Sequence, residues 1–155
     1  MRRFLLWGAL VLAFALAPSL GAVAAEHGTA QEAKAMVERA CAYLRAVGPE
    51  KAFAAFMDPA NKDFHDRDLY VFVRSMDGNT VAHGVNKAMI GHTSLESKDA
   101  DGKLYNKEIM ETAISKGSGW VDYRWPDPVD RKIEQKSSYV QKESNYVIGA
   151  GFYKN

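Results

Sequence analysis

Three stretches of sequence decide the fold: Trp120-Val121-Asp122-Tyr123-Arg124-Trp125-Pro126, then Lys136-Ser137-Ser138-Tyr139-Val140, and last Ile148-Gly149-Ala150-Gly151-Phe152-Tyr153. Their aromatic residues alternate with other residues, as side chains alternate between the two faces of a β-strand. A lone cation, Lys136, lies among these aromatics. A sheet face of this composition can hold a small anion against apolar walls, which indicates a binding module rather than an enzyme. We predict three strands, over 119–125, 132–142 and 145–153.

Two helices are predicted before any strand. Thr29 and Glu32 have the spacing of a capping box, which marks the start of a helix. Apolar residues recur at helical spacing as far as Leu44, so that one stripe of the helix faces a core. Gly48-Pro49 ends this long helix and begins a second, short amphipathic helix around 52–57.

A β-hairpin and an insert follow the helices. Residues 68–75 alternate like a strand, Asp77-Gly78 supplies a tight turn, and 80–83 returns as the partner strand. The segment 84–118 is rich in glycine and polar turns and carries a predicted helix over 105–116. Helices followed by an antiparallel sheet of about five strands, interrupted by a loop-helix insert, predict one α+β domain.

The N-terminus has the pattern of a secretory signal peptide. Arg2 and Arg3 precede an apolar run from Phe4 to Leu16, and Val23-Ala24-Ala25 offers small residues for cleavage. The alternative is an uncleaved membrane anchor, but the run is shorter than the roughly 18–20 residues that a span needs. We expect a cleaved signal peptide over 1–25, a single domain over 26–155 and a periplasmic location.

Composition excludes several classes of function. The formal net charge is +1, without a basic tract, so that nothing favours a nucleic acid partner. The single cysteine, Cys41, lies on the apolar stripe of the long helix and is predicted to be a buried hydrophobe. No nucleophile–base arrangement and no cofactor motif is present, so that no catalytic residue and no cofactor is predicted.

No metal site is predicted either. His27, His65 and His92 lack the spacing of zinc ligands, and only residues far apart in the sequence could assemble a site. The cluster from Asp99 to Gly102 has the carboxylates of a calcium loop, but Met110 stands where that loop needs a glutamate. These acids are instead expected to form turns and to cap the helix that follows.

The order of these motifs resembles that of a single Cache domain, an extracytoplasmic sensor module with a PAS-like sheet, and most closely its small type-2 branch (sCache_2). The resemblance implies a long N-terminal helix packed on the sheet, and a pocket between sheet and insert that binds small molecules, often short carboxylates. Relatives usually lie between the membrane helices of chemoreceptors or kinases. Since this chain stops at Asn155, we expect a stand-alone periplasmic protein that acts through a separate membrane-bound receptor or kinase. The residues that carry the resemblance include Leu69–Val73, Asp77-Gly78, Ala82-His83, Asn86, Gly91, Asp101–Lys103, Gly119–Val121, Tyr123, Trp125, Lys136, Ser138–Val140, Ile148-Gly149 and Gly151–Tyr153.

Lys136 is the sharpest candidate for ligand binding. An ammonium group suits a carboxylate in a partly dry site. Strand parity puts Lys136 and Ser138 on one face and Tyr139 on the other. The competing interpretation is a solvated strand lysine or an ion pair with a neighbour.

Five further residues complete the predicted binding site. The hydroxyls of Tyr70 and Tyr123 are expected to orient the ligand, and Phe72 and Trp125 to exclude water. His83, at the end of the hairpin, is expected to donate a hydrogen bond to the anion. For the four aromatic residues, plain core packing is the competing interpretation, and for His83 an ordinary turn position.

Two functions of different class remain open from the sequence. The first is a non-catalytic binding protein for a short organic acid, with the insert 84–118 as a mobile lid. The second is a structural or interaction module with a vestigial pocket, which meets a partner or a second copy through the long N-terminal helix. Catalysis by residues distant in sequence ranks third.

Overall fold

A computed structural model describes residues 27–154; the predicted signal peptide, 1–25, lies outside the described residues. None of the helices within 27–154 has the length and apolar character needed to cross a membrane. The helices are α1 (Ala30–Val47), α2 (Pro49–Phe56), the 3₁₀ turn η1 (Lys87–Met89) and α3 (Tyr105–Lys116); the strands are β1 (His65–Asp66), β2 (Leu69–Tyr70), β3 (Phe72–Ser75), β4 (Thr80–His83), β5 (Ser118–Pro126), β6 (Ile133–Glu143) and β7 (Tyr146–Tyr153).

Five strands form one antiparallel sheet in the order β4-β3-β7-β6-β5, and β1 and β2 form a separate two-stranded ladder. The predicted α+β class and five-stranded sheet are therefore confirmed. The three C-terminal strands begin and end within one residue of the predicted bounds, because their alternation is unbroken.

The predicted strand over 68–75 is wrong in one respect, because it is divided in two. Leu69 and Tyr70 pair with β1, whereas the chain from Phe72 onward pairs with β4 and β7. Asp68 belongs to neither strand. It lies in the turn between β1 and β2, next to Arg67 at a φ of 56°, and its carboxylate accepts a hydrogen bond from the backbone N–H of Gly28.

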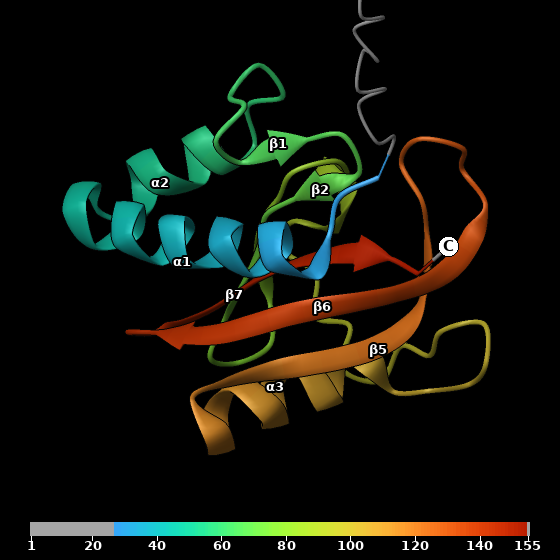
Figure 1. Cartoon of the computed structure of the whole chain (residues 1–155). Helices are drawn as coiled ribbons and strands as arrows, with labels where there is room; N and C mark the ends of the chain where they lie inside the picture. The colour runs from blue at the N-terminus through green and yellow to red at the C-terminus, as the bar shows by residue number, and fades with distance from the viewer. Residues whose placement is uncertain (1–26, 155) are drawn as a thin grey trace, which may run out of the picture.

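The helices α1 and α2 cover one face of the sheet, and α3 covers the other (Figure 1). The capping box predicted for α1 is present: the Thr29 hydroxyl accepts from the Glu32 backbone N–H, and the Glu32 carboxylate accepts from the Thr29 backbone N–H at 2.8 Å. The buried stripe of α1, Cys41 included, packs on Val71, Val73 and other sheet residues in one apolar cluster.

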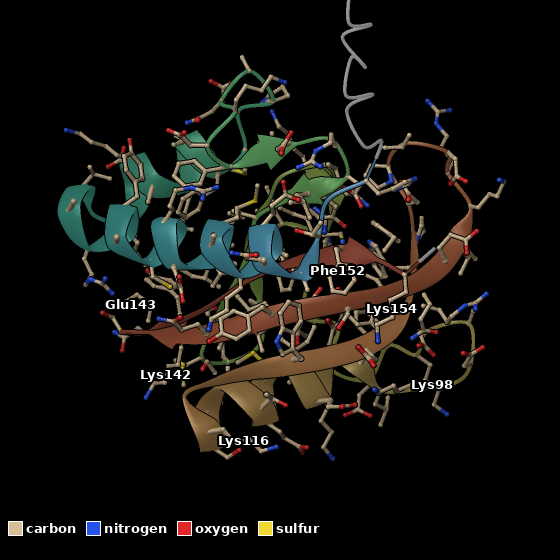
Figure 2. All side chains as sticks on the ribbon, viewed as in Figure 1. Lys98, Lys116, Lys142, Glu143, Phe152 and Lys154 are labelled. Atoms are coloured by element: carbon tan, nitrogen blue, oxygen red, sulfur yellow. The ribbon has the colours of Figure 1, made fainter. Side chains whose placement is uncertain are left out.

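The insert packs against the opposite face, where Ile109 and Ala113 of α3 join a second apolar cluster with residues of β3, β5 and β6. Exposed lysines such as Lys98 and Lys116 lie at the rim of the molecule rather than between its layers (Figure 2). Asp99 forms a turn, as predicted, with its carboxylate accepting three backbone N–H groups. The predicted helix cap is wrong, because the N-cap residue of α3 is Leu104 and makes no side-chain cap.

Thr29→Ala tests the N-terminal cap of α1. The variant loses the acceptor for the Glu32 N–H and half of the capping box, so that the free energy of unfolding should fall by about 1 kcal/mol in urea titrations. Thr93→Ala, at an exposed position away from the helix ends, is the matched control and should unfold like the wild type. Equal losses in both variants would show that the cap does not stabilise α1.

Candidate functional site

A small cavity lies between the sheet and the insert. Its volume is about 10 Å³, which is room for about one water molecule. The walls come from the strands β2 to β5, from η1 and from α3, so that both the sheet and the insert contribute to the lining. Its lining residues are Tyr70, Phe72, Arg74, His83, Met89, Tyr105, Asn106, Ile109, Tyr123 and Trp125.

Five of the six residues predicted from the sequence line this cavity, although they come from four strands. Because they alternate with residues that face α1, Tyr70 and Phe72 project toward the insert. Phe72 lies directly over Gly149, where a Cβ would approach the ring to 2.3 Å. The five are Tyr70, Phe72, His83, Tyr123 and Trp125.

Lys136, the sixth, lies behind the cavity wall instead of in it. Its Nζ is 4.0 Å from the centroid of the Tyr70 ring and 4.7 Å from that of Tyr153, and it donates to the Tyr153 hydroxyl at 3.3 Å. That hydroxyl donates in turn to the Pro126 carbonyl at 2.6 Å. Gly151 leaves the room for this side chain, because a Cβ there would lie 2.8 Å from Lys136 Cε.

Burial changes the charge state of Lys136. The side chain has no exposed surface, and the loss of water around the ammonium lowers its pKa to about 7, although the carboxylates of Asp68 and Asp127 favour the charged form. Near neutral pH, Lys136 therefore exists in both protonation states. A solvated strand lysine, one of the alternatives open from the sequence, is wrong for this residue.

The aromatic walls are tightly packed and carry polar tips. Tyr105 stacks on Tyr123 with ring centroids 4.8 Å apart, and Trp125 lies 5.3 Å from Tyr105. The Tyr123 hydroxyl is hydrogen-bonded to Ser138 Oγ at 2.9 Å. Because burial raises the pKa of both Tyr70 and Tyr123, their hydroxyls stay protonated at neutral pH and can donate a hydrogen bond.

His83 is a neutral donor in this site. Its Nδ1 accepts a hydrogen bond from the Asn86 backbone N–H at 3.1 Å, which leaves the ring proton on Nε2. Burial, followed by the charges of Lys136 and Arg74, lowers the pKa of His83 to about 3. The imidazole, which lines the cavity, therefore carries one N–H and no charge.

Arg74 is the main site residue that the sequence analysis missed. It is only 3% exposed and donates to the Gly78 carbonyl, to Thr80 Oγ1 and to Ser94 Oγ, and also to Asn106 Oδ1. Among residues 27–154, no carboxylate lies within 4.0 Å of its guanidinium, and its Nε has no hydrogen-bond partner. The alternation of 68–75 placed Arg74 on the face of Tyr70 and Phe72, and that was the available signal.

A larger open groove of about 640 Å³ adjoins the cavity. The groove runs between the end of α2, the segment after β4 and the loop after β5. His83 and Trp125 line both the groove and the cavity, so that these two side chains lie between the two spaces.

The arrangement suits the capture of an anion. The cavity wall combines one buried cation, neutral O–H and N–H donors and large apolar surfaces. Its lining residues include no serine, cysteine or carboxylate that would serve as a nucleophile or a general base. Away from this wall, His27, Asp68 and Asp127 form the one group within 27–154 whose side chains have the spacing of metal ligands.

Comparison with known families and proteins gives a consistent picture. The family model dCache_2, described as a Cache domain, matches residues 60–155. The sensor histidine kinase MctS of Rhizobium johnstonii is 33% identical over 57% of this chain, and the methyl-accepting chemotaxis protein McpP of Pseudomonas putida is 28% identical over 96% of it. The matched parts are 20% and 30% of those two proteins, so that the chain spans less than a third of either relative.

Solved structures share the fold. A periplasmic sensor domain of a chemotaxis protein superposes with a TM-score of 0.64 at 26% identity, covering 81% of this chain and 90% of that domain. A second structure, described as a Cache chemosensory domain that recognises carboxylic acids, gives a TM-score of 0.63 at 23% identity, with 81% and 88% of the two chains covered.

The lowered pKa of Lys136 predicts a pH dependence of stability. The folded protein binds fewer protons than the unfolded chain between pH 7 and 10.5, so that stability should rise with pH in this window. Between pH 7.5 and 9, the free energy of unfolding of the wild type should increase by about 1–2 kcal/mol relative to Lys136→Met. Lys142→Met, which removes an exposed lysine from the same strand, should keep the wild-type pH profile. Parallel profiles for wild type and Lys136→Met would show that Lys136 stays charged when buried.

Proposed function

The chain belongs to the Cache domain family, and from this premise we propose that it binds a short organic acid, without catalysis, in the cavity between its sheet and its insert. The acid would take its place among Arg74, His83 and the aromatic walls. The observation that carries the proposal is the buried guanidinium of Arg74, which has no carboxylate partner within residues 27–154 and borders a cavity with neutral donors.

The buried charges on the side of the sheet that α3 covers favour an anion over a neutral or cationic ligand. Arg74 and Lys136 are both buried on this face, and a buried cation without a paired anion is costly. A carboxylate oxygen near Arg74 Nε would supply a missing acceptor and offset the charge. The hydroxyls of Tyr70 and Tyr123 and the Nε2–H of His83 are suited to the remaining lone pairs.

The size of the cavity favours a small acid. Because it has room for about one water molecule, any ligand must displace flexible wall side chains such as Met89. An acid of two or three carbons needs the least displacement. Entry from the groove requires movement of His83 and Trp125, the two residues that line both spaces.

Lys136 acts in this proposal through the Tyr70 ring. The cation–π contact holds the ammonium 4.0 Å from the centroid of a ring that forms the cavity wall. A carboxylate on the other side of that ring would favour the charged form of Lys136, which is about half populated near neutral pH. Rotation of Tyr70 would bring the two charges into direct contact.

The relatives support a signalling role. One is a sensor histidine kinase and the other a methyl-accepting chemotaxis protein, and a structural neighbour is a periplasmic sensor domain. The structural neighbour described as recognising carboxylic acids agrees with the ligand class that we infer from the charges. We therefore propose a periplasmic location and a membrane receptor or kinase as the partner that responds to ligand occupancy.

Thermal unfolding against a panel of acids tests the proposed function. Acetate, propionate, lactate, pyruvate, larger dicarboxylates and amino acids are added to ligand-free protein. Ligand at 100 times its dissociation constant adds about 2.7 kcal/mol, so that the Tm should rise by several degrees for a few short monocarboxylates only. Lys136→Met should reduce this shift while staying folded, because the variant removes the charge behind the Tyr70 ring, and Lys142→Met should keep the full shift. The absence of a shift with every acid would favour the interaction-module function.

Enlarging the cavity should change which acid binds. Ile109 lines the cavity from α3 and is 1% exposed, so that Ile109→Ala should destabilise the fold by about 2–4 kcal/mol and leave added volume. In calorimetric titrations, this variant should prefer an acid one or two carbons longer than the wild-type ligand. Ile114→Ala, on the same helix but 47% exposed, should keep the wild-type preference. An unchanged preference in Ile109→Ala would place the ligand outside this cavity.

A further inference from the structure

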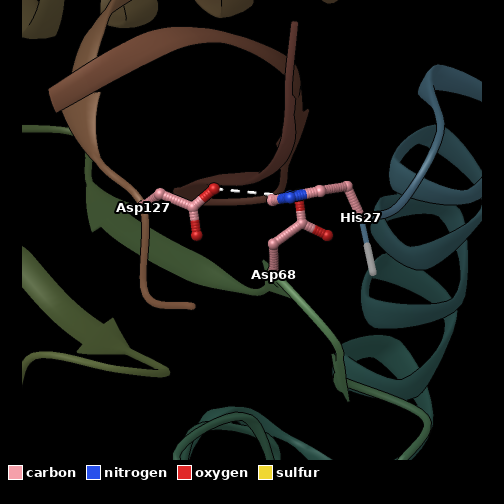
Figure 3. Close-up of side chains that lie close together, drawn as sticks. All are labelled: His27, Asp68 and Asp127. Carbon is pink, nitrogen blue, oxygen red and sulfur yellow. Dashed lines mark ion pairs between the residues drawn. The ribbon is translucent and has the colours of Figure 1, made fainter. Parts of the chain in front are cut away.

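Three metal-ligand side chains meet at the N-terminal end of α1, outside the cavity. His27 precedes the N-cap of α1, Asp68 lies in the turn between β1 and β2, and Asp127 directly follows β5. One ligand atom from each residue lies within 4.8 Å of the other two (Figure 3). Three segments far apart in the sequence thus bring one imidazole and two carboxylates to a single point.

In each carboxylate one oxygen accepts a backbone hydrogen bond, and the other lies within ion-pair distance of His27 Nδ1 without forming a hydrogen bond. Asp68 Oδ1 accepts from the Gly28 backbone N–H at 2.5 Å, and Asp127 Oδ1 accepts from the Val129 backbone N–H at 2.7 Å. The other oxygen of each, Oδ2, is buried without a hydrogen-bond partner, as is Nδ1 of His27. Asp68 is 0% and Asp127 1% exposed, so that bulk solvent does not reach these carboxylate oxygens. A buried carboxylate oxygen without a partner is strongly unfavourable unless a cation binds it.

The distances fit coordination better than hydrogen bonding. His27 Nδ1 lies 3.5 Å from Asp68 Oδ2 and 3.4 Å from Asp127 Oδ2. Hydrogen bonds from nitrogen to oxygen are normally about 2.7–3.2 Å long. Two ligands of a tetrahedral Zn²⁺, each about 2.0–2.1 Å from the metal, are separated by about 3.3–3.4 Å. One ion can therefore lie within bonding distance of both pairs without a large movement of the side chains.

We propose that His27, Asp68 and Asp127 form a site for one divalent cation, with Zn²⁺ the best match. Imidazole nitrogen is a poor ligand for Mg²⁺ and Ca²⁺, which take oxygen, whereas an imidazole with carboxylates suits Zn²⁺. Three protein ligands leave a fourth position open. The His27 side chain is 26% exposed, although its Nδ1 is buried.

The site would fasten the start of α1 to the sheet. A metal bound there joins His27, two residues before the helix cap, to the β1–β2 turn and to the loop between β5 and β6. Asp127 also lines the open groove, and its neighbour Pro126 accepts the hydrogen bond from Tyr153 that leads to Lys136. The metal would therefore connect the N-terminal helix with the loop at the mouth of the groove.

Zn²⁺ titration of the purified protein tests the site. The protein is prepared without a polyhistidine tag and stripped with EDTA, and ZnCl₂ alone is added in a calorimeter and in thermal unfolding scans. We expect saturable binding with a stoichiometry of one and a Tm raised by several degrees at 100 times the dissociation constant. Co²⁺ should bind at the same position and give the intense visible absorption of a low-symmetry, four-coordinate site. Binding of Ca²⁺ or Mg²⁺ more tightly than Zn²⁺ would overturn the role of His27.

Isosteric variants separate metal binding from folding. Asp68→Asn and Asp127→Asn keep the acceptors for the Gly28 and Val129 N–H groups, so that both should fold in EDTA yet bind Zn²⁺ at least about tenfold more weakly. His27→Gln should behave in the same way. His92→Gln, at an exposed histidine outside the cluster, should bind like the wild type. Two results would overturn the site. The first is a Zn²⁺ affinity in the three cluster variants equal to that of the wild type. The second is a wild type that binds no Zn²⁺, which is expected if a protonated His27 bridges the two carboxylates.

Discussion

Two buried cations, Arg74 and Lys136, are the constraint on which the rest of the structure depends. One face of the sheet is conventional, since apolar side chains of α1 and α2 pack on it. The other face carries Arg74 and Lys136, and each needs hydrogen-bond acceptors or π-faces in fixed positions to be tolerated there. The insert supplies Ser94 and Asn106 to Arg74, and the end of β7 supplies Tyr153 to Lys136. The insert therefore completes the environment of a charge as well as covering a sheet.

The sequence predicted most of the fold because periodic signals act locally. Alternation located β5, β6 and β7 to within one residue, and the capping box of Thr29 and Glu32 located α1. The division of 68–75 at Val71 could not be predicted, because a change of strand partner leaves no mark on alternation. The missing cap of α3 has a similar origin, since Asp99 satisfies backbone groups of its own turn and of β5.

For the candidate site, the sequence predicts which residues share a face of a strand. Tyr70, Phe72, Tyr123 and Trp125 could be assigned to one face by parity, and the structure brings them to one cavity. The residues from the insert, Tyr105 and Asn106 among them, could not be assigned, because the sequence does not say where an irregular loop docks. The same limit hid the meeting of His27, Asp68 and Asp127, whose proximity depends on three turns folding together.

The hydrogen bonds of Arg74 have a consequence for how this domain changes state. One guanidinium holds the β3–β4 turn through Gly78, the loop through Ser94 and the helix α3 through Asn106. An anion that binds this guanidinium must compete with these bonds or tighten them, so that ligand occupancy and the order of the insert are thermodynamically linked. Such linkage is reciprocal. If a partner prefers one arrangement of the insert, its binding changes the affinity of the domain for the ligand by some factor. Binding of the ligand then changes the affinity for the partner by the same factor. The affinity measured for the isolated domain would then differ from the affinity in a complex with a partner that prefers one arrangement of the insert.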